Sequence, residues 1–213
     1  MTASLKSCTF ETAVKKGYWL GQRDKPFTIC DTPGLNDPNG QDSSNVFNLV
    51  TKLKEVKSVD AFIVALNGQC PRLDNGIKDM LLLFKNIFGE NFYKNIIIVF
   101  TRWSFDKRSQ HRRSEIGLIE DDHSSEWNGQ FKREFEVEED LSVVFVDACY
   151  YRDDFDESSA FERETDKLWK IINSFGKFEC KNVEAVETER DQLMKMISES
   201  NQTIEILGKY FFS

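Results

Sequence analysis

One short motif combines the residue types that contact a phosphate group and its metal ion. Asp31-Thr32-Pro33-Gly34-Leu35 follows an apolar run at residues 27–30 and precedes a polar loop at residues 36–45. A carboxylate at a strand end can hold the hydration shell of Mg²⁺, and a glycine lets its backbone N–H approach a γ-phosphate. The alternative is a Pro-Gly turn in which Asp31 caps the next helix. The position after an apolar run favours nucleotide binding by Asp31, Thr32, Pro33 and Gly34.

A second candidate segment follows the apolar run at residues 95–100. Proteins that bind guanine nucleotides place Asn/Thr-Lys-x-Asp at such a strand end, where the aspartate accepts hydrogen bonds from the guanine edge. Thr101-Arg102 fits the first half of this pattern, Ser104 occupies the aspartate position, and Asp106 lies two residues later. We predict base contacts from Thr101, Arg102 and Asp106. A strand-end loop with a stacked tryptophan is the open alternative.

A third candidate is the turn at residues 147–150, which follows the last apolar run. Ala148 and Cys149 are small residues that could contact a base through backbone N–H groups, although an ordinary strand-end loop explains them equally well. The phosphate-cradling loop Gly-x-x-x-x-Gly-Lys-Ser/Thr does not occur in the sequence. In P-loop proteins that loop precedes the Asp-x-x-Gly strand, so we expect the chain to begin after it.

The elements that must position these residues alternate along the chain. Continuous apolar runs predict strands covered on both faces of a parallel sheet, at residues 27–30, 61–66, 95–100 and 141–146. Apolar stripes at helical spacing lie between or after them, at residues 46–56, 77–88, 116–135 and 161–172. A further strand around residues 10–20 is expected to form a hairpin with the first run.

This alternation predicts an α/β fold with a doubly wound, mostly parallel sheet, because parallel strands need crossover helices. We assign residues 1–176 to this domain, without the first strand and phosphate loop. Residues 177–213 are assigned to a C-terminal helical extension, because the segment at residues 181–207 is charged, lacks Gly and Pro and carries only sparse apolar residues.

Composition limits the classes of function. The net charge of −8 argues against a nucleic-acid partner, which requires a positive field. Five cysteines without a CxxC pair predict buried free thiols rather than disulfides or a zinc site. No apolar stretch reaches the length of a transmembrane helix and no signal-peptide core is present, so we expect a cytoplasmic protein.

The three motifs, in their order and spacing, resemble the immunity-associated nucleotide-binding GTPases (the IAN/GIMAP family, avirulence-induced-gene type). This family consists of septin-like P-loop GTPases. The resemblance rests on Cys-Asp-Thr-Pro-Gly-Leu-Asn-Asp at residues 30–37, on the apolar strand at residues 60–67 and on Ile-Ile-Val-Phe-Thr-Arg at residues 97–102. It covers roughly residues 3–175.

The resemblance implies a P-loop GTPase fold that binds GTP or GDP with Mg²⁺. Asp31 would contact the Mg²⁺ shell through water, and Gly34 would sense the γ-phosphate. Thr101 and Arg102 would lie beside the base, which Ala148 and Cys149 would contact through their backbone. The family implies a homo-oligomer, or a complex with a related GTPase, through the switch surfaces.

The chain departs from the family pattern at two functional positions besides the phosphate loop. Ser104 replaces the guanine-selecting carboxylate, and Leu35 stands where small GTPases place a water-orienting glutamine. Hydrolysis is therefore expected to be weak or partner-assisted, and enzymatic activity stays an open question. The alternative function is a nucleotide-free pseudo-GTPase that serves as a protein-interaction scaffold.

Overall fold

The computed structural model describes residues 12–32, 42–69 and 72–180. The chain divides into two compact units, which are described separately. One includes the hairpin and helix within residues 1–56, and the other comprises residues 57–181. The predicted strand-end motifs are shared between them, with Asp31 in the first unit and Thr101 to Cys149 in the second.

The first unit contains the expected hairpin. Strands β1 (Ala13–Tyr18) and β2 (Pro26–Asp31) pair antiparallel, with Ala13 opposite Asp31 and Tyr18 opposite Pro26. A 3₁₀ turn η1 (Trp19–Gly21) joins them, and Leu20 and Gly21 adopt positive φ angles of 49° and 78° there. Helix α1 (Asp42–Val56) follows and contains the predicted stripe at residues 46–56.

The predicted environment of the first apolar run is wrong, although its strand is confirmed. Ile29 on β2 is 46% exposed. Within its own unit, β2 pairs antiparallel with β1. Antiparallel hairpins tolerate water on one face, and so short an apolar run does not distinguish such a strand from one covered on both faces.

The second unit is an α/β domain built on a parallel sheet. Its strands β4 (Phe62–Asn67), β5 (Ile96–Thr101) and β6 (Ser142–Val146) lie in the order β4-β5-β6. Val64 is opposite Ile98, which is in turn opposite Val143. The α/β prediction is therefore confirmed.

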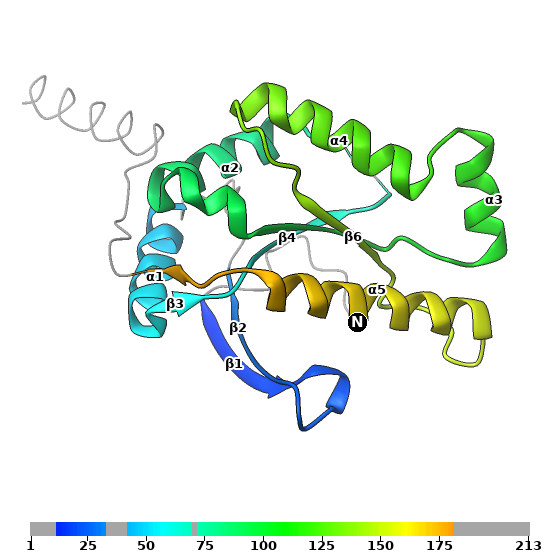
Figure 1. Cartoon of the computed structure of the whole chain (residues 1–213), viewed down its shortest axis with the longest axis horizontal. Helices are drawn as coiled ribbons and strands as arrows, with labels where there is room; N and C mark the ends of the chain where they lie inside the picture. Colours follow the sequence, from blue (N-terminus) through cyan, green and yellow to red (C-terminus); the bar gives the residue numbers. More distant parts are fainter. Residues whose placement is uncertain (1–11, 33–41, 70–71, 181–213) are drawn as a thin grey trace, which may run out of the picture. The chain divides into compact units, whose positions relative to one another are not determined.

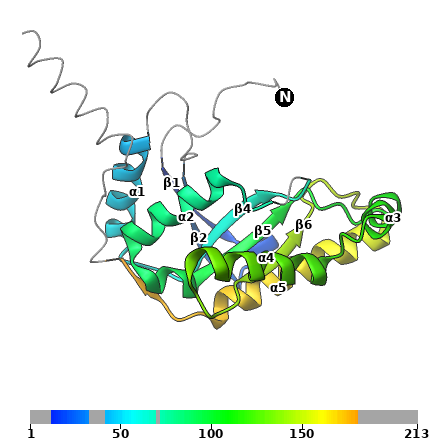
Figure 2. The same cartoon turned by 90° about the horizontal axis from the view of Figure 1, so that it is seen from above.

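Helices connect these strands and cover both faces of the sheet. They are α2 (Asn75–Phe88), α3 (Lys107–Glu115), α4 (Glu120–Phe135) and α5 (Phe155–Ser174), with a 3₁₀ segment η2 (Glu90–Asn95) before β5. Helices α2 and α4 lie on one side of the sheet and α5 on the other (Figure 1). The view from above shows α3 beyond the end of the sheet (Figure 2). A short antiparallel pair, β3 (Ser58–Val59) and β7 (Phe178–Glu179), completes the unit.

Aromatic side chains fill the core on the α2 and α4 side of the sheet. Phe100 on β5 stacks on Phe145 of β6 at a centroid distance of 5.4 Å. Phe131 of α4 is fully buried and contacts Tyr93 edge-on. Burial of such rings contributes to the stability of this unit.

The other side of the sheet is less completely covered at its edge. Among the described strands, β4 pairs only with β5, and Ile63 on its outward face is 45% exposed. The expectation that the run at residues 61–66 is covered on both faces is therefore wrong for this strand. No helix in the described part of the chain has the length and apolar character to span a bilayer.

Candidate functional site

The carboxyl ends of the three parallel strands meet at one edge of the sheet, the usual ligand-binding edge of open α/β folds. The ends of β4 and β5 are tied together there. The Thr101 hydroxyl donates to the carbonyl oxygen of Leu66 at 2.9 Å, and the Gly68 N–H donates to the carbonyl oxygen of Thr101 at 2.7 Å. A Cβ on Gly68 would lie 2.7 Å from that same oxygen, so only glycine fits. Thr101 therefore holds the ends of β4 and β5 together. Its predicted position beside a base stays a prediction.

Arg102 begins the loop after β5 and is an exposed cation at this edge. Its φ of 58° is left-handed, which is unusual for a residue with a side chain. Its side chain is exposed and makes no ion pair or hydrogen bond with any described residue. The next residue is hydrogen-bonded to the sheet. The Trp103 N–H donates to the carbonyl oxygen of Val146 at 3.3 Å. Arg102 is thus held between two anchored neighbours.

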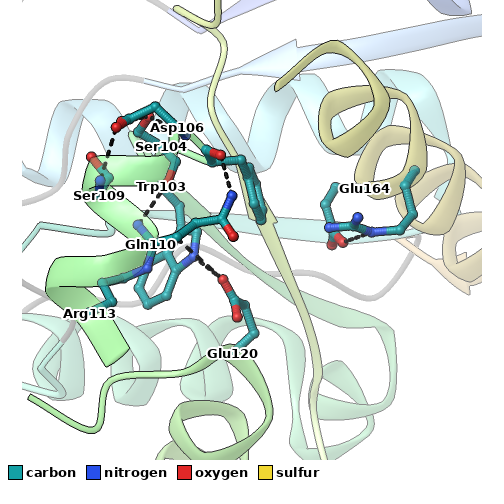
Figure 3. Close-up of polar contacts among 10 residues, drawn as sticks. Trp103, Ser104, Asp106, Ser109, Gln110, Arg113, Glu120 and Glu164 are labelled. Carbon is teal, nitrogen blue, oxygen red and sulfur yellow. Dashed lines mark hydrogen bonds and ion pairs between the residues drawn. The ribbon is translucent and has the colours of Figure 1, made fainter. Parts of the chain in front are cut away.

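Trp103 is an internal residue, with only 1% of its surface exposed. Its Nε1 donates to Glu120 Oε1 at 2.6 Å, and the Arg113 guanidinium carbon lies 4.5 Å from its ring centroid (Figure 3). His123 stacks near its ring at 5.9 Å. A strand-end loop with a stacked tryptophan was the alternative expected from the sequence. The structure contains that stack, and it lies inside the fold.

Asp106 begins helix α3 as its N-cap. Its Oδ1 accepts from the Ser109 N–H at 2.9 Å and its Oδ2 from the Ser104 hydroxyl at 2.7 Å (Figure 3). Hydrogen bonds from the side chain of Ser109, the Ser104 hydroxyl and the Ser109 amide lower the pKa of Asp106 to about 2. Asp106 is therefore ionised and engaged within its own loop. Its predicted contact with a base stays a prediction.

The loop after β6 presents a different surface. Asp147 is buried, and its Oδ1 accepts from the Cys149 N–H at 3.0 Å. Ala148 and Cys149 are themselves exposed. The expected burial of the Cys149 thiol is therefore wrong, because the turn directs this residue outward. Within this turn the Cys149 amide is already used by Asp147.

The predicted phosphate-side residues belong to the first unit. Asp31 is exposed at the end of β2, and Thr32 after it is half-buried. Pro33 and Gly34 lie outside the described residues, as does the segment predicted as a helix at residues 181–207. Within the second unit, the structure brings Thr101, Arg102, Ala148 and Cys149 to neighbouring strand ends.

The described acidic residues suit a magnesium ion that keeps most of its water ligands, and not one held by several carboxylates. No cluster of three or more His, Cys, Asp or Glu side chains that could hold a metal occurs among the described residues. Asp31 stands as a single exposed carboxylate. Mg²⁺ commonly binds through one or two carboxylates while keeping several waters and taking further ligands from substrate phosphates. Asp31 is suited to that water-mediated role and not to a metal cage.

Sequence reasoning missed the residues that hold the β5–α3 loop in place. Arg113 donates from Nη1 to the Ser104 carbonyl oxygen at 2.7 Å, and Glu120 accepts from Trp103. Neither residue belongs to a recognisable motif, so no sequence signal indicated them. Gly68 could have been singled out, because a glycine directly after a strand often marks close approach of two backbones.

Comparison with known proteins shows the fold. No family model and no curated protein sequence matches the chain. A crystal structure of Toc33 from Arabidopsis thaliana, a dimerization-deficient mutant, has a TM-score of 0.59 and 16% sequence identity. Its match covers 82% of this chain and 72% of that one. Toc33 in complex with GDP and Mg²⁺ has a TM-score of 0.54 and 14% identity, covering 84% and 77%.

A third similar structure comes from work on dimerization and GTPase activity of the chloroplast translocon components atToc33 and psToc159. It has a TM-score of 0.50 and 15% identity, and the match covers 78% of this chain and 68% of that one. At these identities the likeness concerns the fold alone. The chain has the α/β fold of P-loop GTPase domains, as the sequence analysis predicted.

Proposed function

We propose that this chain is a guanine-nucleotide-binding domain of the immunity-associated GTPase type, acting as a nucleotide-dependent switch or oligomerising GTPase. Residues 1–176 would form the nucleotide-binding domain. Residues 177–213 would form a C-terminal helical extension. GTP or GDP with Mg²⁺ would be the ligand.

One observation carries the proposal. In a fold similar to that of GDP-bound Toc33, Arg102 and the pair Ala148 and Cys149 are exposed at neighbouring strand ends. This edge is where open α/β sheets bind nucleotides. Arg102 would cover one side of the base, and the turn after β6 would line the other. Asp31 would contact the hydrated Mg²⁺, whose charge would offset that of the phosphates.

The chain offers little for rapid hydrolysis. Its sequence has no Gly-x-x-x-x-Gly-Lys-Ser/Thr segment, and Leu35 follows Gly34 where a water-orienting glutamine would stand. Binding by this chain would therefore depend on the base and Mg²⁺ contacts, and turnover would be slow or assisted by a partner. That partner would be a second copy or a related GTPase, and two of the similar structures concern dimerization.

A nucleotide-free scaffold is the second candidate, and specific observations favour it. Asp106, which the sequence placed near a base, and its neighbour Trp103 are both engaged in internal contacts. In the described part of the sheet, β4 has an unpaired edge that could accept a strand from a protein partner. These features would suit a GTPase fold retained for protein interaction.

A titration distinguishes the two functions. The full chain would be titrated with a fluorescent GTP analogue and Mg²⁺, with GDP and ADP as competitors. We expect binding that GDP but not ADP reverses and that Asp31→Ala weakens. Asp24→Ala is the matched control, because it removes the same charge from an exposed position in the same hairpin. No binding, or equal competition by ADP, would overturn the guanine-nucleotide function.

A further inference from the structure

A second feature of the carboxyl edge is a cavity of about 430 Å³ beside helix α3. Its wall comes from the turn after β4, from the loop after β5, and from α3 with the residues that follow it. Arg102, Arg112 and Arg113 line it together with Trp103, Ile116 and Leu118. Neither Ala148 nor Cys149 takes part, so the cavity is separate from the turn after β6.

The cavity is cationic in a protein that is acidic overall. None of the described residues that line it is acidic, whereas the whole chain carries a net charge of −8. Two of its guanidinium groups, those of Arg102 and Arg112, form no ion pair with any described residue. Exposed guanidinium groups without an ion-pair partner are available to hydrogen-bond an anion that enters the cavity.

Arg113 has a different role from the other two arginines. Its guanidinium donates to the Ser104 carbonyl oxygen at 2.7 Å, lies over the Trp103 ring and reaches Glu120 at 3.5 Å. It is therefore a fixed part of the wall, and its position is set by the fold. The charges available to a ligand are those of Arg102 and Arg112, one from the loop and one from the helix.

Part of the cavity lining is apolar. Ile116 is 75% exposed, although it is a large aliphatic residue, and Leu118 beside it packs partly against the core. Trp103 also lines the cavity. An exposed isoleucine next to two free guanidinium groups indicates a ligand with a charged end and an apolar body.

We propose that this cavity binds a small organic phosphomonoester, whose phosphate is held by Arg102 and Arg112 and whose organic group contacts Ile116 and Leu118. The planar guanidinium group matches phosphate oxygens in bidentate pairs. A phosphate dianion neutralises both arginines, whereas a carboxylate would leave one of them unpaired. The cavity exceeds the size of inorganic phosphate and falls in the usual range for small-molecule sites.

The test uses phenyl phosphate as the probe and the full chain without nucleotide or Mg²⁺. It varies Arg112, which lines the cavity and is no part of the proposed nucleotide site, so the two proposals can fail separately. Binding would be followed by isothermal titration calorimetry. We expect phenyl phosphate to bind and Arg112→Gln to weaken it by about tenfold, the usual effect of losing a charge-assisted hydrogen-bonding partner. Inorganic phosphate should bind more weakly than phenyl phosphate.

Two further variants make the test specific. Arg108→Gln removes the same charge from an exposed position on α3 that does not line the cavity, so it should leave the affinity within about twofold of the wild-type value. Ile116→Ser should weaken phenyl phosphate and leave inorganic phosphate unchanged. The proposal is overturned if phenyl phosphate does not bind at about 10 mM, if both arginine variants weaken it equally, or if Ile116→Ser has no effect.

Discussion

The loops that follow β5 and β6 leave adjacent strands of one sheet, yet they are built in opposite ways. After β5 the chain buries Trp103 and ties Ser104 and Asp106 into the start of α3. After β6 the chain buries only Asp147, which turns Ala148 and Cys149 outward. The loop after β5 packs into the fold, whereas the loop after β6 exposes Ala148 and Cys149 to solvent.

This difference shows that distinctive residue types do not by themselves mark the ligand-contacting part of the edge. Trp103 and Asp106 are the most distinctive residues near the edge, and both serve the fold. Ala148 and Cys149 carry little chemistry of their own and are accessible. Arg102 is the exception, because it belongs to the structural loop and is nevertheless exposed and unpaired within the described part of the chain.

The largest effect that tests this comparison should come from Trp103→Ala. Removing a fully buried indole from the core leaves a cavity and takes the partner from Glu120, so we expect a loss of about 3–5 kcal/mol of unfolding free energy. Urea unfolding of the full chain measures it. Tyr151→Ala, at a side chain that is 76% exposed, should cost less than about 0.5 kcal/mol. Equal losses in the two variants would contradict the structural role of the β5 loop.

Gly68→Ala should have the next largest effect. The added Cβ would meet the backbone oxygen of Thr101 at 2.7 Å, and the two strand ends would have to separate. We expect a loss of about 1–3 kcal/mol, as for other overpacked sites, measured by thermal or urea unfolding. Gly176→Ala is the control, because its Cβ would meet nothing within 4 Å. If Gly68→Ala were as stable as Gly176→Ala, the close approach of Gly68 to the Thr101 carbonyl oxygen would be contradicted.

Asp106→Ala should cost about 1 kcal/mol, the usual value for loss of an N-cap. Asp106→Asn should be nearly neutral near pH 7, because asparagine caps helices as well as aspartate does. The lowered pKa of about 2 means that the stabilisation is present above the unfolded pKa near 4 and is lost as the pH falls toward 2. The Asn variant should lack this acid-dependent loss in unfolding experiments between pH 5 and 2. If the Asp106→Asn variant lost as much stability between pH 5 and 2 as the wild-type chain does, the prediction would be contradicted.

His123 should make the same region sensitive to mild acid. It is buried beside Trp103 and Phe100, and burial lowers its pKa from the usual 6.5 even though Glu126 opposes the shift. The unfolded chain then binds a proton more readily, so stability should fall as the pH falls below about 6.5. His123→Phe should reduce this fall in unfolding experiments. An unaltered pH dependence in His123→Phe would refute the prediction.

The smallest effect should be that of Cys149→Ser. The side chain is exposed and the amide that donates to Asp147 is retained, so we expect a change of less than about 0.5 kcal/mol. Urea unfolding measures it beside Trp103→Ala. A loss as large as that of the tryptophan variant would remove the contrast between the two loops.

The sequence was sufficient to predict the main elements of the fold. Alternating apolar runs and helical stripes predicted the three parallel strands, and the further strand around residues 10–20 predicted the hairpin, because these signals are local. The prediction that both faces of β2 and β4 are covered was wrong. A run of apolar residues indicates a strand and does not say how many of its faces will be covered.

The candidate site could be predicted only in part. Asp-x-x-Gly and Thr-Arg were recognisable as strand-end motifs. The burial of Trp103 depends on Glu120 and Arg113, which come from later in the chain and carry no motif. The sequence of α3, Lys-Arg-Ser-Gln-His-Arg-Arg-Ser-Glu, has no apolar stripe, so its extent could not be predicted. Its definite start comes from the Asp106 cap.

The most direct test of the account is the protection of Cys149 by nucleotide. The full chain would be alkylated with and without GDP and Mg²⁺, and the rate at the peptide containing Cys149 would be followed by mass spectrometry. If a guanine nucleotide rests on the turn after β6, GDP should slow alkylation of Cys149 and ADP should not. An unchanged rate with GDP, or equal slowing by ADP, would contradict a guanine-nucleotide site at this edge of the sheet.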